Sequence, residues 1–321
     1  MAVTLSEIAK VSQSPLQKGI LLNLLRFSPL LDVVPFEPAD ALDNIVVRWK
    51  TLPSVASRKI NAGYDESTGD TEQVTESIRP MGGDIDVDKV LESLPNVLEK
   101  PSVTQINMKT KAMAFYFNYL FIKGSVAVDP DAFYGLEYRV SQLPARQKFA
   151  IGSAGTPFDC TASTANEHAF VDALHEMDDL VGGASAFFCN RKMRLGVGRV
   201  LRRLGLLDTT KDQFERTVYT FNGAPIIDAG LKADKSTEII TDTEDPGDGG
   251  NDTTSIYAVH FGQPEGLVGV QLNDLDAYLV TNELESKPSK RWRIDWVVGL
   301  AGFGDYYATR MYNLEPATSW T

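Results

Sequence analysis

The sequence predicts an α+β fold, and three observations carry that prediction. Residues 102–123 place apolar and aromatic side chains at the spacing of one long helix. After residue 205 the chain changes to short runs of β-branched and aromatic residues separated by turn residues, which is typical of strands. Ahead of the long helix, residues 44–88 contain a polar segment that is too long for an ordinary loop of a compact domain.

The composition narrows the class of protein further. A chain of 321 residues with 43% hydrophobic content can bury the core of one large or two medium domains. Its net charge of −12 argues against a dedicated nucleic-acid reader, which needs clustered Lys and Arg. No apolar run reaches the roughly 20 residues of a membrane span, and no basic-then-apolar signal peptide stands at the start. Cys160 and Cys189 are too few for a disulfide framework, so we expect buried thiols in a reducing cytoplasm.

The first 43 residues predict an arm. Residues 15–26 have the pattern of a short amphipathic helix, and residues 27–36 continue as an apolar strap interrupted by prolines. Such a strap packs either on its own body or on a neighbouring chain.

The segment from residue 44 to residue 88 is the most informative part of the chain. Ile45, Val47 and Trp49 alternate with Val46 and polar residues, which predicts a strand over residues 44–52. Residues 53–72 are mostly Ser, Gly, Asp, Thr and Glu, and a second extended stretch returns over residues 73–88. A segment this polar cannot offset its ordering entropy by burial on its own domain. We therefore expect it to lie on another chain, which favours an assembly protein over an enzyme.

The long helix is expected to form a structural spine. Ser102 and Gln105 fit a capping box at its start, and Gly124 fits its end. The predicted interior positions recur at helical spacing: Val103, Ile106, Met113, Phe117, Leu120 and Phe121.

Further helices and strands follow the spine. Asp129-Pro130 predicts a second helix start, with apolar Phe133, Leu136, Val140 and Leu143. A capping box at residues 164–167 predicts a third helix that ends at Gly182-Gly183, and Asn190 is expected to cap a basic helix over residues 191–204. Strands are predicted at residues 185–189, 217–221, 255–261, 266–272, 277–280, 291–298 and 306–314, with turns at Asn222-Gly223 and Lys287–Lys290.

Catalytic and metal-binding patterns are weak throughout. His168 and His175 are seven residues apart on a predicted helix, whereas metal-binding histidines on a helix more often stand four apart. Residues 243–252 are rich in Asp and Gly but lack the spacing of a calcium loop. Gly196-Val-Gly198 lies within a helix pattern, which is the wrong context for a dinucleotide site. We expect no catalytic residue, no metal and no cofactor.

Charged clusters are candidates for subunit contacts. Asp84, Asp86 and Asp88 share one face of a predicted strand and form either an acidic edge or a charged contact. Two explanations fit the basic helix. It is either a solvated helix face or a patch complementary to acidic stretches at residues 65–76 and 84–88 of another subunit. Its basic residues are Arg191, Lys192, Arg194, Arg199, Arg202 and Arg203.

The order of these parts resembles the major capsid proteins of tailed bacteriophages, which share the Hong Kong 97-type fold. The local resemblance lies in residues 81–88, 184–190, 221–228 and 291–314. It implies four regions: an N-arm over 1–43, an E-loop with its strands over 44–92, a peripheral domain over 93–140 and 272–303, and an axial domain over 141–271 and 304–321.

The resemblance also implies a function and its partners. The chain would self-assemble as hexamers and pentamers into an icosahedral phage head that encloses double-stranded DNA without sequence-specific binding. A portal protein would occupy one vertex. Any scaffold or decoration protein would be a separate chain, and a scaffold could be absent. Assembly in the bacterial host cytoplasm would give a virion, with no membrane partner. An encapsulin-like cargo compartment and an α+β hydrolase or metal enzyme are the alternatives.

Interface residues follow from the same resemblance. Some relatives join subunits by a Lys–Asn bond, for which Lys59 and Asn282 could serve, but we expect no such cross-link. The E-loop contacts are predicted at Arg58, Lys59, Tyr64, Asp65, Glu66, Glu72 and Glu76. Those of the three-fold hairpin are predicted at Glu285, Lys287, Lys290 and Arg291.

Overall fold

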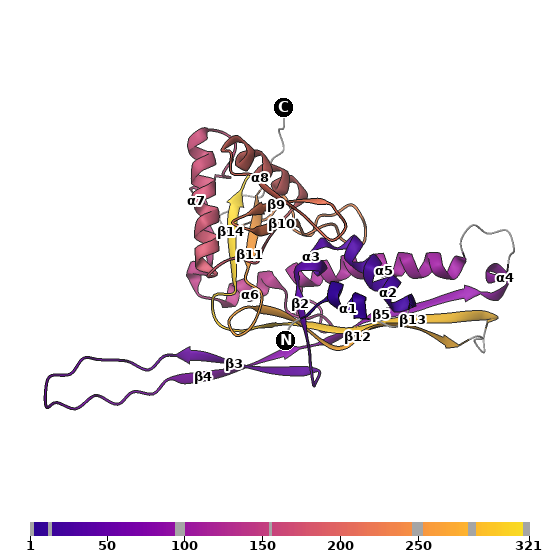
Figure 1. The fold of residues 1–321 in the computed structure, drawn as a ribbon, viewed down its shortest axis with the longest axis horizontal. Coiled ribbons are helices and arrows are strands. Elements are labelled where there is room, and N and C mark those ends of the chain that lie inside the picture. The colour runs from indigo at the N-terminus through magenta and orange to yellow at the C-terminus, as the bar shows by residue number, and fades with distance from the viewer. Residues whose placement is uncertain are drawn as a thin grey trace.

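The computed structural model describes residues 3–11, 15–93, 100–153, 156–245, 253–281 and 287–316. Figure 1 shows three parts: a thin arm that projects to one side, an elongated part built on a long helix and a sheet, and a third part that stands on it. We call them the arm, the peripheral part and the axial part. Their helices and strands confirm the predicted mixed class.

The peripheral part packs helices on one face of a five-stranded sheet. Its sheet has the order β1-β2-β12-β13-β5, and α5 (Pro101–Lys123) runs along it (Figure 1). The other helices are α1 (Leu5–Val11), α2 (Pro15–Phe27), α3 (Pro29–Val33) and α4 (Lys89–Glu92). The strands are β1 (Val3–Thr4), β2 (Pro35–Pro38), β5 (Arg79–Asp88), β12 (Leu267–Thr281) and β13 (Ser289–Gly302).

An aromatic cluster joins the N-terminal segment, the spine helix and the sheet. The Trp296 ring lies 5.3 Å from that of Phe117 and 5.5 Å from that of Phe36, and all three side chains are buried. Such tilted aromatic pairs add about 0.5–1.5 kcal/mol each to the burial itself. The apolar strap over residues 27–36 therefore packs on its own body, because Leu30, Leu31 and Phe36 belong to this core.

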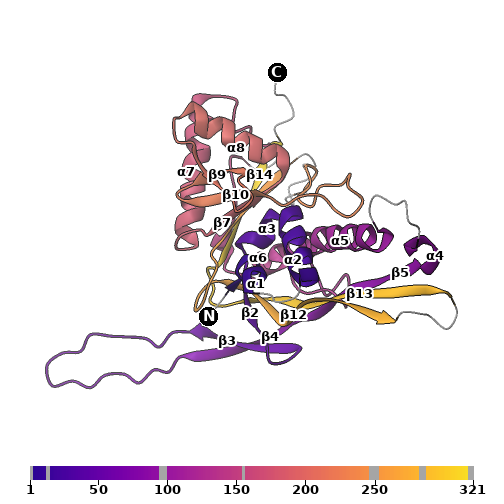
Figure 2. The same cartoon turned by 45° about the vertical axis from the view of Figure 1, so that its right-hand side comes forward.

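The axial part is a seven-stranded sheet covered by α7 (Thr164–Leu180) and α8 (Arg191–Arg203) (Figures 1 and 2). Its order is β6-β14-β11-β7-β10-β9-β8, and the central strand β7 is buried on both faces. The strands are β6 (Lys148–Ala150), β7 (Ala186–Cys189), β8 (Asp208–Lys211), β9 (Thr217–Phe221), β10 (Ala224–Asp228), β11 (Thr254–Val259) and β14 (Ala308–Leu314). Between the two parts stands the short helix α6 (Leu136–Gln142), followed by the 3-10 turn η1 (Ala145–Gln147).

The arm is a two-stranded ribbon with a long exposed tip. β3 (Asp43–Thr51) pairs antiparallel with β4 (Asp70–Ser77), and residues 52–69 between them form no strand. A small apolar cluster of Val46, Ile78, Val270 and Ala301 attaches the root of the ribbon to the peripheral sheet. The arm leaves the body there and extends away from it in both views (Figures 1 and 2).

Three predicted helix starts are wrong in detail. Pro101 occupies the first turn of α5, so Ser102 is already helical and its hydroxyl donates to Glu92 instead of capping. Asp129 organises a turn, and the next helix, α6, begins at Leu136. The cap of α7 is Ser163, whose oxygen accepts from the Asn166 amide, one residue earlier than predicted.

Some of the remaining secondary-structure predictions are confirmed and others are wrong. The Asn190 cap, the strand at residues 217–221 and the turn at Asn222-Gly223 are confirmed, whereas residues 266–272 and 277–280 belong to one bulged strand, β12. Ser289 and Lys290 already lie in β13, so the predicted turn is wrong there. Val103, predicted inside the spine, is 43% exposed.

Two glycines test how tightly the peripheral core is packed. A methyl group at Gly269 would lie 2.6 Å from the Phe36 ring, whereas at Gly19 on the exposed side of α2 it would meet nothing within 4 Å. We expect Gly269→Ala to destabilise the protein by about 1–3 kcal/mol through overpacking. Gly19→Ala should stabilise it by up to about 1 kcal/mol through helix propensity. Thermal unfolding followed by circular dichroism measures both, and equal effects would contradict this packing.

Candidate assembly surfaces

The arm presents an apolar face to solvent. Ile45, Val47 and Trp49 on β3 are 60%, 57% and 70% exposed, while Val46 between them is 3% exposed. The alternation predicts the strand correctly but not the buried face, because Val46 and Arg48 face the body. We call Ile45, Val47 and Trp49 the apolar ridge; three large exposed apolar side chains in a row are typical of surfaces that contact another molecule.

Glu76 fixes the root of the arm inside the protein. The Arg139 guanidinium donates to both Glu76 carboxylate oxygens at 2.6 and 2.8 Å and to the Leu300 carbonyl at 2.8 Å. Arg48 donates to the Gly302 carbonyl at 2.9 Å and lies 3.4 Å from Glu76. Burial alone would lower the pKa of Arg139, but the Glu76 carboxylate outweighs burial and raises it. Glu76 therefore anchors the arm from within and is not one of its exposed contacts.

The tip of the arm is held by its own polar contacts. Arg58 donates to the Ala62 carbonyl at 3.2 Å and its guanidinium lies 5.0 Å from the centre of the Tyr64 ring. Ser67 donates to the Ser54 carbonyl across the loop at 2.8 Å. The other predicted arm contacts are also exposed: Lys59, Asp65, Glu66 and Glu72.

The acidic run on β5 is neutralised within the chain. Asp84 accepts from Arg293 at 2.6 and 2.9 Å, and Asp86 accepts from Arg291 at 2.7 and 2.8 Å. These hydrogen bonds lower the pKa values of both carboxyl groups. Asp88 caps α4 by accepting from the Val90 amide. Strand β13 thus supplies partners for this run within the chain, and a contact between the run and another subunit stays a prediction.

The predicted hairpin contacts lie at the far end of the peripheral sheet. Lys287 is exposed and Lys290 is partly buried on β13, next to Arg291. Glu285 and Asn282 lie outside the described residues, as does most of the Asp- and Gly-rich segment after residue 245.

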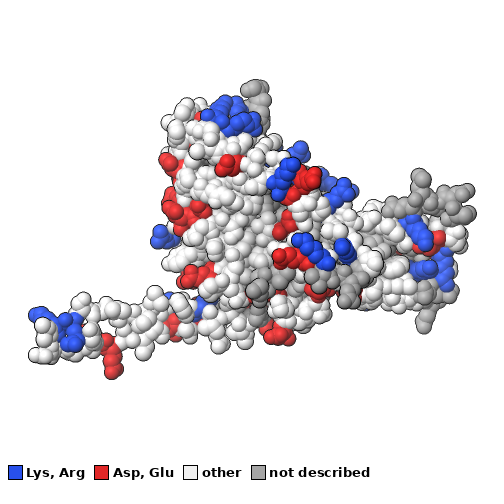
Figure 3. Space-filling view, viewed as in Figure 1, with Lys and Arg blue, Asp and Glu red and all other residues white. Residues whose placement is uncertain are grey.

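The basic helix α8 is partly paired. Lys192 donates to Asp242, and Arg203 donates to the buried Glu167 of α7. Arg194 points toward the sheet side, and its buried Nε has no hydrogen-bond partner among the described residues. The exposed remainder of α8 includes Arg191 and Arg202. In Figure 3 basic atoms gather at the top of the view, near one end of α8.

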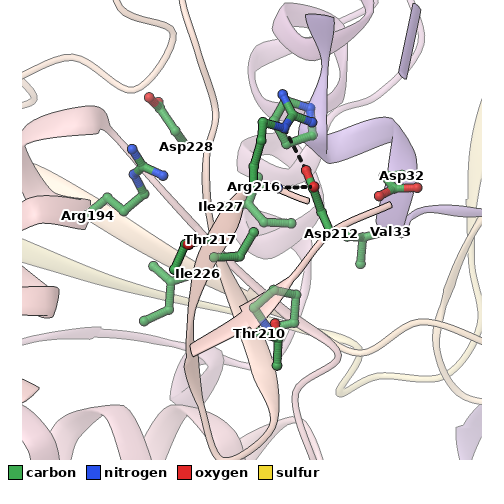
Figure 4. A pocket seen from close by; sticks show the side chains of 13 residues that line it. Asp32, Val33, Arg194, Thr210, Asp212, Arg216, Thr217, Ile226, Ile227 and Asp228 are labelled. Atoms are coloured by element: carbon green, nitrogen blue, oxygen red, sulfur yellow. Dashed lines mark hydrogen bonds and ion pairs between the residues drawn. The ribbon is translucent and has the colours of Figure 1, made fainter. Parts of the chain in front are cut away.

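A cavity of about 430 Å³ lies between α3 and the β8–β9–β10 edge of the axial sheet (Figure 4). Arg216 donates to Asp212 at 2.7 Å on one wall, and Arg194 lies on the other. Burial and the nearby Asp212 carboxylate raise the pKa of Asp32, which accepts from Gln213. The described lining carries carboxylates, guanidinium groups and the hydroxyls of Thr210 and Thr217.

A second buried charge cluster joins the spine helix to the axial part. Lys123 at the end of α5 donates to Glu244 at 2.8 Å and to Glu137 of α6 at 3.1 Å. Arg310 of β14 donates to Glu244 at 2.9 Å. Burial would raise the pKa of Glu244, but the two cations outweigh burial and lower it.

The histidines and cysteines form no metal site in the described part of the chain, where no group of three or more His, Cys, Asp or Glu side chains converges. His175 contacts Asn222 at 3.2 Å, and the His260 ring contacts the Gly183 carbonyl at 2.6 Å. Both cysteines are buried and free, and burial raises the pKa of Cys160 to about 12. Among the described helices, none combines the length and the apolar character that crossing a membrane requires.

Comparisons with known proteins place these surfaces in context. Residues 24–165 match the family model of the major capsid protein GP7, and no curated protein matches the chain. The holo-SrpI encapsulin complex from Synechococcus elongatus PCC 7942 is similar at 16% identity with a TM-score of 0.63, over 91% of this chain and 89% of that one. The capsid of a native GTA particle is similar at 16% identity with a TM-score of 0.61, over 91% of this chain and 90% of that one. Mycobacterium phage Cain matches over 99% of both chains at 12% identity and 0.55.

These likenesses confirm the predicted Hong Kong 97-type fold. The sequence reasoning missed the apolar ridge and the Glu76–Arg139 pair. The alternation of residues 45–49 was the available signal for the ridge, but alternation alone does not tell which face is covered.

Removing the Glu76–Arg139 pair should destabilise the arm root strongly. Arg139→Met leaves the Glu76 carboxylate buried without its main partner, and we expect a loss of about 3–5 kcal/mol in the free energy of unfolding. Arg146→Met, at an exposed arginine, is the control and should change stability by less than about 0.5 kcal/mol. Urea unfolding measures both, and similar midpoints for the two variants would refute the anchoring role.

Glu244 should make stability depend on acid pH. Its pKa is lower in the folded than in the unfolded state, so its contribution is present above the ordinary value of 4.5 and is lost as the pH falls below it. Glu244→Gln should reduce the slope of the free energy of unfolding against pH by up to the amount for one proton, about 1.4 kcal/mol per pH unit. Unfolding curves between pH 3 and pH 7 (roughly the range of carboxyl titration) test this, and unchanged slopes would contradict it.

Proposed function

We propose that this chain, which has the Hong Kong 97-type fold and matches the GP7 major capsid protein model over residues 24–165, is the structural, non-enzymatic shell protein of a tailed-phage head. It assembles as hexamers and pentamers into an icosahedral particle that encloses double-stranded DNA. The capsid role itself agrees with the predicted function and with the phage capsids among its structural neighbours.

The apolar ridge of the arm carries this proposal. Ile45, Val47 and Trp49 project from a ribbon that leaves the body, so its own chain cannot cover them. Burying each of these side chains on a neighbouring subunit contributes about 1.5–3 kcal/mol. Since every subunit of a closed shell both gives and receives an arm, modest contacts add up by multivalency.

The root of the arm makes this contact geometrically defined. The Glu76–Arg139 pair and the Arg48–Gly302 hydrogen bond fix the ribbon against the sheet, while residues 52–69 at the tip stay exposed. A ribbon held at one end and free at the other can overlap a neighbour in one direction. We propose that the tip residues Arg58, Lys59, Tyr64, Asp65, Glu66 and Glu72 and the peripheral residues Lys287, Lys290 and Arg291 contribute the polar rim of such contacts.

The remaining partners follow from a phage head. A portal protein at one vertex, separate scaffold or decoration proteins and packaged DNA would complete it, with assembly in the host cytoplasm and residence in the virion. The net charge of −12 suits a wall that does not bind phosphates tightly. We propose the four-region division that the sequence predicts, with β3, β4 and their loop as the projecting part of the E-loop, and with residues 3–11, residues 15–38 and β5 packed in the peripheral part.

An encapsulin-like cargo compartment is the second candidate. The similarity to the SrpI encapsulin complex favours it, because both shells are built on this fold. The contents of purified particles separate the two: nuclease-protected DNA indicates a phage head, and an enclosed enzyme indicates a compartment.

Polar substitution of the ridge should abolish shells without unfolding the subunit. We expect I45S/V47S/W49S to raise the protein concentration needed for assembly by at least tenfold, because each tenfold corresponds to only about 1.4 kcal/mol. Electron microscopy and size-exclusion chromatography measure this. The control T71S/Q73S/T75S changes the polar residues directly opposite on β4 and should assemble normally. Closed particles from the ridge variant at the wild-type concentration would overturn the proposal.

A further inference from the structure

The two helices of the axial part expose faces of opposite charge on different edges of the molecule. In Figure 3, separate acidic patches with a basic group among them lie along the edge at α7, and basic atoms gather at the top near α8. The views in Figures 1 and 2 place α7 along one side of the axial sheet and α8 across its upper end. Neither charge group takes part in the arm contact proposed above.

The acidic face of α7 is a regular stripe. Asp172, Glu176 and Asp179 are exposed at positions i, i+4 and i+7, which lie on one side of a helix. Among the described residues none of these three carboxylates has an ion-pair partner. The buried acidic residues of α7 differ, because Glu167 already pairs with Arg203.

The exposed face of α8 carries two arginines on one side of the helix, with a leucine between them. Arg191, Leu195 and Arg202 are exposed at positions i, i+4 and i+11, and Leu195 adds an apolar contact at 45% exposure. In the described part of the chain, Arg191 and Arg202 have no carboxylate partner within ion-pair distance. A single chain therefore carries an acidic helix face and a basic helix face that do not meet each other.

We propose that the acidic stripe of α7 docks on the basic stripe of α8 in the next copy of this chain around a capsomer. Complementary faces on different edges of one molecule make a head-to-tail contact, and such contacts close into rings when the rotation between copies allows it. Charge complementarity sets the register of neighbours and rejects wrong pairings more than it adds affinity. The inference rests on the proposed shell function and names a contact separate from the arm.

A contact between the acidic face of α7 and the basic face of α8 also explains why α8 is basic in an acidic protein. Six of its 13 residues are Lys or Arg, while the whole chain carries a net charge of −12. Lys192 and Arg203 form ion pairs within the chain, Arg194 and Arg199 are only partly exposed, and Arg191 and Arg202 are exposed. The sequence left two explanations for this helix, a solvated face or a patch complementary to acidic residues 65–76 and 84–88 of another subunit. Of those acidic residues, Asp86 and Asp84 already form ion pairs with Arg291 and Arg293.

Charge reversal with rescue tests the contact. D172K/E176K and R191E/R202E should each raise the concentration needed for assembly at least tenfold, and the combined four-residue variant should restore it to within about threefold of wild type. D131K/D305K, at exposed carboxylates away from both helices, is the control and should assemble normally. Failure of the combined variant to recover, with each variant folded by circular dichroism, would overturn the proposal.

A disulfide trap gives an independent readout. Because Cys160 and Cys189 are buried, A169C/L195C places new thiols on the two stripes, and oxidation should give a ladder of covalent rings up to the hexamer on non-reducing gels. Wild-type particles combined with the absence of a ladder would reject the α7–α8 contact and leave the shell function standing. Failure of the wild-type chain to form any closed particle would instead reject the shell function itself.

Discussion

The direction in which the arm leaves the body depends on the buried ion pair between Glu76 and Arg139. The arm has a small apolar cluster at its root and a fully exposed tip, so burial alone fixes its direction weakly. Arg139 lies on α6, and it also holds the Leu300 carbonyl of the peripheral sheet. One guanidinium group thus ties together the arm, the short helix and the sheet. A buried pair is weak evidence for stability as such, but it gives one defined geometry when all its hydrogen bonds are satisfied.

The short helix α6 links the two charge clusters of the molecule. Its Glu137 lies against Lys123 and Arg310, and its Arg139 lies against Glu76. The spine helix ends at the first cluster, and the arm begins at the second. One seven-residue helix therefore connects the end of the spine helix, the axial part and the root of the arm.

Charge in this protein is organised locally, although the whole chain is acidic. On β13, Arg291 and Arg293 form ion pairs with Asp86 and Asp84 of the neighbouring strand β5. Charged residues on an edge strand disfavour pairing with the strand of another molecule. The helices of the axial part are different, because their outward stripes have no ion-pair partner among the described residues. In the proposed assembly, apolar burial on the arm would supply affinity and charge matching on the axial helices would set the register.

The sequence by itself determined the mixed fold class, the spine helix, the strand-rich second half and the arm, because periodicity and turn residues are local properties. It also indicated an assembly protein, because a polar arm of this length cannot offset its ordering entropy by burial on its own domain. Helix starts were misplaced where a proline or an earlier serine took the cap, as at Pro101 and Ser163. Only the tertiary structure decided which face of β3 is exposed, that Asp84 and Asp86 are paired internally, and that Glu76 is buried against Arg139. The physical reason is the same in each case: the partner lies on a segment distant in the sequence, and neither alternation nor charge spacing records what that segment covers.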